Sequence, residues 1–240
     1  MAISFSPTSE DVNQYRTFRA LSRKLNETIV RTIPMQAYAE IGEALGIRRN
    51  GVLVFDTEDM VAVLSDCCLY DWYRDGKNQV QRYVETHPAA PGTDESYLFN
   101  ACLRAQYRVL WTESVVPGAG LYCRDGFTKE ELFLMDVAFS ESMPRERVVL
   151  ATRTLPLGEY WMGTGAALPL DSETDIVGSL KRVQKEFGDS IEEAAIVPIA
   201  IVRACLAAGA AERIVYAGPQ PPEKRRHEPR WPGSKRRKRK

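Results

Sequence analysis

The chain has 240 residues, of which 44% are hydrophobic and 27% charged, and its formal net charge is zero. This composition is typical of an ordinary globular protein with one sizeable core or two small ones. No apolar run approaches the roughly 20 residues that a membrane span requires, and the N-terminus lacks the basic and apolar regions of a secretory signal. The sequence therefore predicts a cytoplasmic protein with no membrane partner.

The charge is distributed unevenly. Residues 223–240 contain ten Lys and Arg and two Glu, a net charge of +8, whereas the rest of the chain has 22 basic and 30 acidic residues, a net charge of −8. An acidic body thus carries a basic tail. The five cysteines are odd in number and show no C-x-x-C spacing, so we expect reduced thiols in a core and neither a zinc site nor a disulfide framework.

The first 106 residues are predicted to be mainly helical. Apolar residues recur at threes and fours from Tyr15 to Ile29, the pattern of a helix that buries one face. Pro34 should end this helix because its ring disfavours helix in the residue before it. Further helices are expected at residues 35–45, at 56–86 with a break at Asp75-Gly76, and at 93–105.

Residues 107–170 carry the β signals. Runs rich in Val, Leu, Phe, Tyr and Thr alternate with Gly and Pro turns. They predict an antiparallel meander that closes into a small barrel or folds over a helix, with residues 132–137 as its central strand. Asp136 interrupts that strand, and we expect it to pair with Arg153. The five runs are 108–116, 120–124, 131–139, 147–155 and 160–167.

Two helices, at residues 171–187 and 190–208, should follow, and the prolines and charges of residues 219–240 predict a disordered tail. The sequence therefore predicts an α+β fold: N-terminal helices, a five-stranded antiparallel sheet or small β-barrel, two C-terminal helices and a disordered basic tail. The corresponding regions are 1–106, 107–170, 171–218 and 219–240.

Histidine-based catalysis is unfavoured, since the sequence has only His87, before a proline, and His227, in the tail. Three carboxylates, Asp66, Asp71 and Asp75, cluster among aromatic residues. They could hold a metal for hydrolysis, or they could lie on a solvated helix face, which we favour. The short glycine motifs at 118–120 and 163–165 lack the residues of a phosphate loop. We expect no cofactor and no resident metal.

The basic tail is the candidate nucleic-acid contact, because Lys and Arg neutralise phosphates and release counterions without reading sequence. Trp231 could stack on an unpaired base. A solubilising or targeting tail is the competing interpretation. The candidate residues are Arg225, Arg226, Arg230, Trp231, Lys235, Arg236, Arg237, Lys238, Arg239 and Lys240.

Six segments of residues 19–169 carry a resemblance to a known family: LSDCCLYD (64–71), RDG (74–76), AQYR (105–108), VPGAGLYCRD (116–125), ATR (151–153) and MGTGAALP (162–169). Through them the chain resembles uncharacterised bacterial proteins that often carry a SEC-C motif at one end. The resemblance implies a shared fold more than a shared function. The zinc-binding cysteines of a SEC-C knuckle are absent from residues 232–238, so the resemblance leaves only the basic character there.

The sequence thus favours a non-catalytic cytoplasmic binding or adaptor protein whose tail contacts nucleic acid, the ribosome or another polyanion. One alternative is a metal-assisted hydrolase that uses the carboxylates near residues 66–75. The other is a structural protein that forms homo-oligomers through an apolar helix face within residues 191–206.

Overall fold

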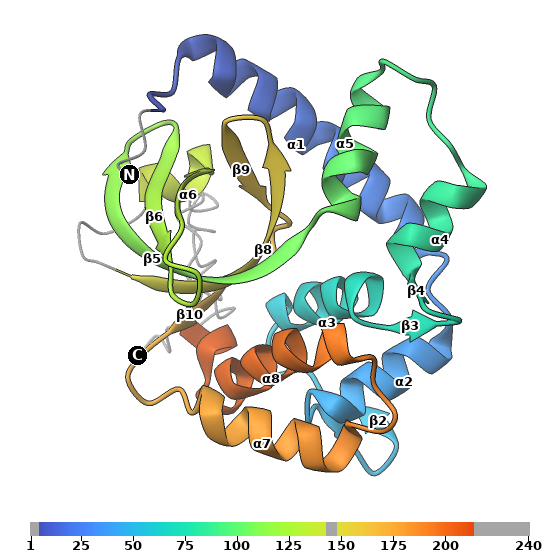
Figure 1. Ribbon diagram of the computed structural model, residues 1–240. Coiled ribbons are helices and arrows are strands. Elements are labelled where there is room, and N and C mark those ends of the chain that lie inside the picture. The colour runs from blue at the N-terminus through green and yellow to red at the C-terminus, as the bar shows by residue number, and fades with distance from the viewer. Residues whose placement is uncertain (1–4, 143–147, 214–240) are drawn as a thin grey trace, which may run out of the picture.

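The computed structural model describes residues 5–142 and 148–213. It places a small β-barrel beside and above a body of helices (Figure 1). The first helix begins at a capping box between Thr8 and Asp11, and Pro34 follows its end. The described helices are α1 (Ser9–Val30), α2 (Met35–Ala44), α3 (Asp59–Tyr70), α4 (Gln79–Thr86), α5 (Asp94–Leu103), α6 (Val137–Ser142), α7 (Ile176–Phe187) and α8 (Glu193–Ala207), with a 3-10 turn at Ala210–Arg213.

The strands form two short hairpins and one larger sheet. In the second hairpin the turn consists of Asp75 and Gly76, both with positive φ, which explains the predicted break after α3. The hairpin strands are β1 (Arg48–Arg49), β2 (Val52–Leu53), β3 (Tyr73–Arg74) and β4 (Lys77–Asn78); those of the larger sheet are β5 (Gln106–Val116), β6 (Gly120–Asp125), β7 (Glu131–Met135), β8 (Val149–Leu157), β9 (Tyr160–Gly163) and β10 (Leu168–Leu170).

Five strands of the larger sheet close into a barrel. Their order is β8-β5-β6-β7-β9, and pairing between β8 and β9 closes the ring. The β7–β9 pair is parallel, whereas the other barrel pairs are antiparallel. The helix α6 connects the third strand to the fourth. This strand order, with its one parallel pair and its helix, is the topology of the OB-fold, a five-stranded Greek-key barrel.

The predicted α+β fold with a small barrel is confirmed, with corrections in its strands. One barrel pair, β7–β9, is parallel, whereas the sequence predicts antiparallel pairing throughout. The run 131–139 is a strand only to Met135, because the Asp136 side chain accepts a hydrogen bond from Phe139 N at 3.1 Å and begins α6. The run 160–167 ends as a strand at Gly163, and the sequence missed β10, which pairs with β8 beyond the end of β9. The sequence predicts residues 132–137 as the central strand of a sheet, but every strand of a closed barrel has two neighbours, so none is central.

Two apolar cores result. One fills the barrel interior with Leu110, Leu121, Cys123, Leu132, Leu134 and Leu150. The other joins the outer face of β5 and β8 to the helices, chiefly α3 and α8, which lie below the barrel in Figure 1. Within α8, Ile199, Ile201 and Val202 are each at most 1% exposed. The apolar face proposed for self-association is therefore already used inside this chain.

The five cysteines are buried and unbonded to one another, as the sequence predicts. Cys67 and Cys68 both lie in the helical core, and burial raises the pKa of each thiol. In the part of the chain that the structure describes, none of the helices combines the length and hydropathy needed to cross a bilayer.

Candidate functional site

A buried group of three charges joins the barrel to the helices. Arg153, on the outer face of β8, donates from Nε to Asp66 Oδ2 at 2.9 Å and from Nη2 to Asp71 Oδ2 at 2.5 Å. The three side chains are only 3–7% exposed. Two rings flank the guanidinium, with their centroids 4.6 Å (Tyr70) and 5.2 Å (Tyr107) from its carbon. We refer to Arg153, Asp66 and Asp71 as the ion triad.

The ion triad has one more acid than base. Burial opposes the charge of Arg153, but Asp71 and Asp66 outweigh burial and raise the pKa of the guanidinium. For Asp71 burial is the largest influence, and it raises the pKa from 3.8 to about 7 in spite of Arg153. Asp71 is therefore close to half protonated at neutral pH.

This shift predicts that folding stability falls as pH rises from about 4 to about 7. The pKa of Asp71 is higher in the folded state than in the unfolded state, so the folded state binds more protons in that window and loses stability as they dissociate. Urea unfolding measures this effect as the difference in the free energy of unfolding between the wild type and Asp71→Asn. Across this pH range the difference should change by up to about 1.4 kcal/mol per pH unit. Parallel pH profiles would contradict the assignment.

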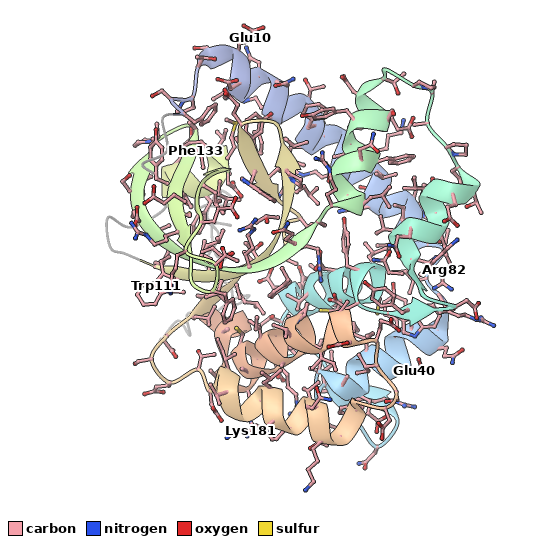
Figure 2. The ribbon with its side chains drawn as sticks, in the orientation of Figure 1. Glu10, Glu40, Arg82, Trp111, Phe133 and Lys181 are labelled. Carbon is pink, nitrogen blue, oxygen red and sulfur yellow. The ribbon has the colours of Figure 1, made fainter. Side chains whose placement is uncertain are left out.

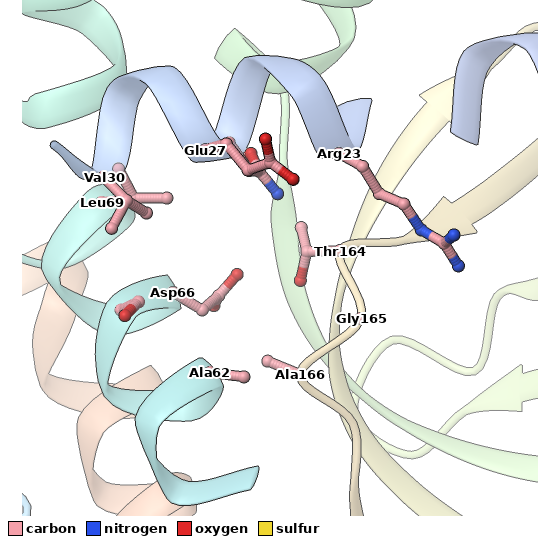
Figure 3. Close-up of a pocket in the computed structure, with 11 residues that line it drawn as sticks. Arg23, Glu27, Val30, Ala62, Asp66, Leu69, Thr164, Gly165 and Ala166 are labelled. Carbon is pink, nitrogen blue, oxygen red and sulfur yellow. The ribbon is translucent and has the colours of Figure 1, made fainter. Parts of the chain in front are cut away.

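A pocket of about 370 Å³ opens beside the ion triad. Its walls come from α1, from α3 and from the segment that follows β9 (Figure 3). Asp66 faces this pocket from α3, opposite Thr164, and Thr164 N donates to the carbonyl of Arg153 at 3.0 Å. The lining residues are Arg23, Asn26, Glu27, Val30, Ala62, Ser65, Asp66, Leu69, Thr164, Gly165 and Ala166.

A second buried arginine lies inside the barrel. Arg108 Nη1 donates to Asp125 Oδ2 at 2.9 Å and to Glu130 Oε2 at 2.8 Å, and the Trp161 ring lies 4.3 Å from the guanidinium carbon. Asp125 also accepts from two backbone amides of its turn, so it shapes the turn as well as pairing with the arginine. This arginine secures the β6–β7 turn to the barrel interior.

The carboxylate cluster predicted from sequence is only partly assembled. The favoured interpretation, a solvated helix face, is wrong for Asp66 and Asp71, which are buried and meet at Arg153. Asp75 lies on the exposed β3–β4 turn with its side chain 93% exposed. In residues 5–142 and 148–213, His, Cys, Asp and Glu form no group of three suited to a metal ion. The expected pairing of Asp136 with Arg153 is wrong, because Asp136 caps α6 while Asp66 and Asp71 hold the arginine.

Two exposed aromatic rings mark the outside of the barrel. Trp111 on β5 is 58% exposed and Phe127 in the β6–β7 turn is 59% exposed, and Figure 2 shows Trp111 at the barrel surface. The Trp111 ring lies against Gly126, where an added Cβ would be 3.1 Å from the indole nitrogen. Phe127 is the next residue in the chain after Gly126, and we call Trp111 and Phe127 the ring pair.

The charges around the ring pair are balanced. Arg124, opposite Trp111 in the sheet register, pairs with Glu113 at 2.8 Å and Glu131 at 3.0 Å. Lys129 Nζ donates to the carbonyl of Gly126 at 2.5 Å. This surface therefore offers rings and hydrogen-bonding groups without a strong positive potential.

The neighbouring aromatic surface of the barrel is covered. Phe5 packs on Phe133, with ring centroids 5.2 Å apart, and on Tyr160 at 6.1 Å. Tyr122 Oη donates to the carbonyl of Phe5 at 2.8 Å. The segment before α1 therefore covers the outer face around Phe133 and Tyr160, and it leaves the ring pair exposed.

Comparison with protein families gives one match. Residues 9–194 match a family described as "Family of unknown function (DUF7986)". The chain belongs to this DUF7986 family. The matched region of the DUF7986 chain includes the barrel, the ion triad and the pocket, and it ends before the basic tail. No curated protein and no solved structure matches the chain significantly.

The match supports membership of an uncharacterised family, whereas the link to SEC-C proteins and a bacterial origin stay predictions. The predicted tail contacts of this DUF7986 protein, Arg225 to Lys240, lie outside the described residues. Sequence reasoning missed the ion triad and the ring pair. The available signal for the triad was Arg153 itself, an arginine in an otherwise uncharged run from Val148 to Leu157.

Proposed function

We propose that this DUF7986 protein is a non-catalytic binding protein for single-stranded nucleic acid. In this proposal it is a cytoplasmic adaptor, whose partner is free nucleic acid or exposed strands of the ribosome. The barrel topology supports the proposal in general, because barrels of this kind bind oligonucleotides, commonly on the outer face of their second and third strands. Here Phe5 packs on part of that face, and the ring pair lies beside it, on β5 and in the β6–β7 turn. A fold alone does not determine a function, so the argument depends on the exposed side chains.

The observation that carries the proposal is the ring pair. A Trp and a Phe that are each more than half exposed beside one glycine provide two flat apolar surfaces, and large apolar side chains seldom cluster at the surface without a partner. Stacking of one base on an aromatic side chain contributes about 1–3 kcal/mol and tolerates any base. The ring pair therefore suits a single strand rather than a duplex.

The positive charge that binds phosphates must come from another part of the chain, since Glu113 and Glu131 neutralise Arg124 beside the ring pair. The tail at residues 223–240 carries +8, enough to contact several phosphates and to make affinity strongly salt-dependent. We infer a division of roles in which the tail attracts the strand and the ring pair stacks on its bases.

The alternatives have less support in the described residues. Arg153 occupies both carboxylates that a hydrolase would use, and Asp75 is remote on a turn. The α8 face suggested for self-association is buried within the chain. In both cases the groups that the function needs are already engaged within the chain.

The decisive experiment measures binding of fluorescent oligothymidylate to four proteins across a salt series: the full chain, a truncation after Pro222, Trp111→Ala and Phe55→Ala. The truncation should lose most of the salt slope, whereas Trp111→Ala should weaken binding roughly 5- to 150-fold at every salt concentration. Phe55 is 39% exposed in the helical body, so Phe55→Ala is the matched control and should bind like the wild type.

The outcomes separate the two roles. Wild-type affinity for Trp111→Ala would remove the ring pair from the proposal and leave the tail as the only contact. An unchanged salt slope after truncation would remove the tail. Failure of the full chain to bind any oligonucleotide would reject the proposed function.

A further inference from the structure

The pocket beside the ion triad has the features of a built site. It brings together helices α1 and α3 and the segment 164–166, which are far apart in the sequence. Its volume of about 370 Å³ lies in the range of small-molecule sites. Apolar side chains, Val30, Leu69 and Ala166, contribute to its walls. The polar and charged side chains of the lining decide what can bind, and they are Arg23, Asn26, Glu27, Ser65, Asp66 and Thr164.

Of the three charged side chains in its wall, Arg23, Glu27 and Asp66, only Asp66 is buried. Asp66 is 6% exposed and lines the pocket, and its Oδ2 accepts from Arg153 Nε at 2.9 Å. The same arginine also serves Asp71. One guanidinium therefore serves two buried acids, and the ion triad carries a net negative charge whenever both acids are ionised. A cation in the pocket, close to Asp66, would supply the missing positive charge.

The second polar group is a hydroxyl that lacks a partner. Thr164 Oγ1 is buried and makes no hydrogen bond in the described structure. Thr164 lies across the pocket from Asp66 in Figure 3. A hydroxyl can accept a hydrogen bond as readily as donate one, and a buried unpaired hydroxyl is costly. A ligand that donates to both Asp66 and Thr164 would satisfy both groups.

The mouth of the pocket carries charges of both signs, so the preference for a cation depends on the buried Asp66. Glu27 is exposed at the rim, and Figure 3 shows the Arg23 guanidinium directed away from Asp66. Arg19 is held nearby by a hydrogen bond of 2.6 Å from Nη1 to the carbonyl of Gly163. The described residues provide no metal-binding group of three, so an organic cation is favoured over a metal ion.

We propose that this pocket binds a small molecule through a primary ammonium group, which donates hydrogen bonds to the Asp66 carboxylate and the Thr164 hydroxyl while its carbon chain packs on Val30 and Leu69. An ammonium group has three donors and a compact charge, which suits two facing acceptors. The inference is independent of nucleic-acid binding, because the pocket and the ring pair involve different residues.

The test uses calorimetric titration of the full chain with 1,4-diaminobutane and n-butylammonium, and with tetramethylammonium as a cation that lacks N–H donors. Saturable binding of the two amines, with none or much weaker binding of tetramethylammonium, is the expected result. Thr164→Val should weaken amine binding by about tenfold or more, the loss of one hydrogen bond to a charged group. Thr17→Val, on the exposed surface of α1, should leave it unchanged.

Asp66→Asn should abolish amine binding, but it also alters the ion triad, so its fold must be checked by circular dichroism. Thr164→Val keeps the proposal testable if Asp66→Asn does not fold. Absence of saturable amine binding, equal binding of tetramethylammonium, or wild-type affinity in Thr164→Val would each overturn the proposal.

Discussion

Replacement of Arg153 by methionine should lower the free energy of unfolding by about 3–5 kcal/mol, the largest effect that we expect from any single charged residue. The substitution keeps an apolar stem between Tyr70 and Tyr107 but removes the only cation shown to pair with Asp66 and Asp71 in the described structure. Two carboxylates would then stay buried without compensation. Chemical denaturation at pH 7 measures this loss directly.

Two further variants separate charge from packing. In the Arg153→Met background, Asp66→Asn combined with Asp71→Asn should restore much of the lost stability, because the uncompensated charges are removed and the shapes are kept. Arg182→Met is the surface control, since Arg182 pairs with Asp175 at 3.5 Å with both side chains more than half exposed, and it should cost about 0–1 kcal/mol. A loss in Arg153→Met as small as that of Arg182→Met would show that the ion triad is not coupled to folding.

The fold was largely predictable because the patterns that encode it are local. The apolar stripe from Tyr15 to Ile29 gave α1, and Gly and Pro turns separated the β runs. The errors occur where a single side chain or a distant strand decides. Asp136 ends β7 by capping α6. Strand β10 forms because Leu168–Leu170 pair with the part of β8 that β9 does not cover, and no local pattern specifies this pairing.

The orientation of the side chains of β5 also could not be predicted fully from local patterns. Alternation predicts Val109, Trp111 and Val115 on one face and Arg108 and Thr112 on the other. The prediction is wrong for Val115, because the β-bulge between Thr112 and Ser114 shifts the register and Val115 packs with the interior leucines. It is right for the other four residues, but a polar face is usually expected to meet solvent. Here Arg108 and Thr112 point into the barrel, because Asp125 and Trp161 surround the arginine and Thr112 bonds to the carbonyl of Val148. Trp111 consequently becomes the exposed residue.

The candidate sites were less predictable than the fold, because they depend on contacts between distant segments. Arg153 is 82 and 87 residues from its two partners, and a single sequence gives no signal that connects them. The pocket likewise needs α1, α3 and the segment 164–166 to meet. Composition did identify the basic tail, since charge is a property of the chain itself.

Arg108, the arginine inside the barrel, should have the second largest effect on the free energy of unfolding. Arg108→Met should cost about 2–4 kcal/mol, because Asp125, 4% exposed, would lose its buried ion pair while keeping only the two amides of its turn. The loss should be smaller than for Arg153→Met, since Glu130, the other partner of Arg108, is 47% exposed and can be solvated. Thermal and urea unfolding measure this difference.

Arg124→Met is the matched control on the adjacent strand. Arg124 also bonds two glutamates, but its side chain is 48% exposed, so we expect a loss of about 0–1 kcal/mol. In the Arg108→Met background, Asp125→Asn should recover stability. The Oδ1 atom accepts both turn amides and Oδ2 faces the arginine, so an amide whose oxygen takes the Oδ1 position keeps the turn and removes the unpaired charge. If Arg108→Met costs no more than Arg124→Met, the interior pair contributes nothing beyond a surface salt bridge, and the barrel derives its stability from its leucine core alone.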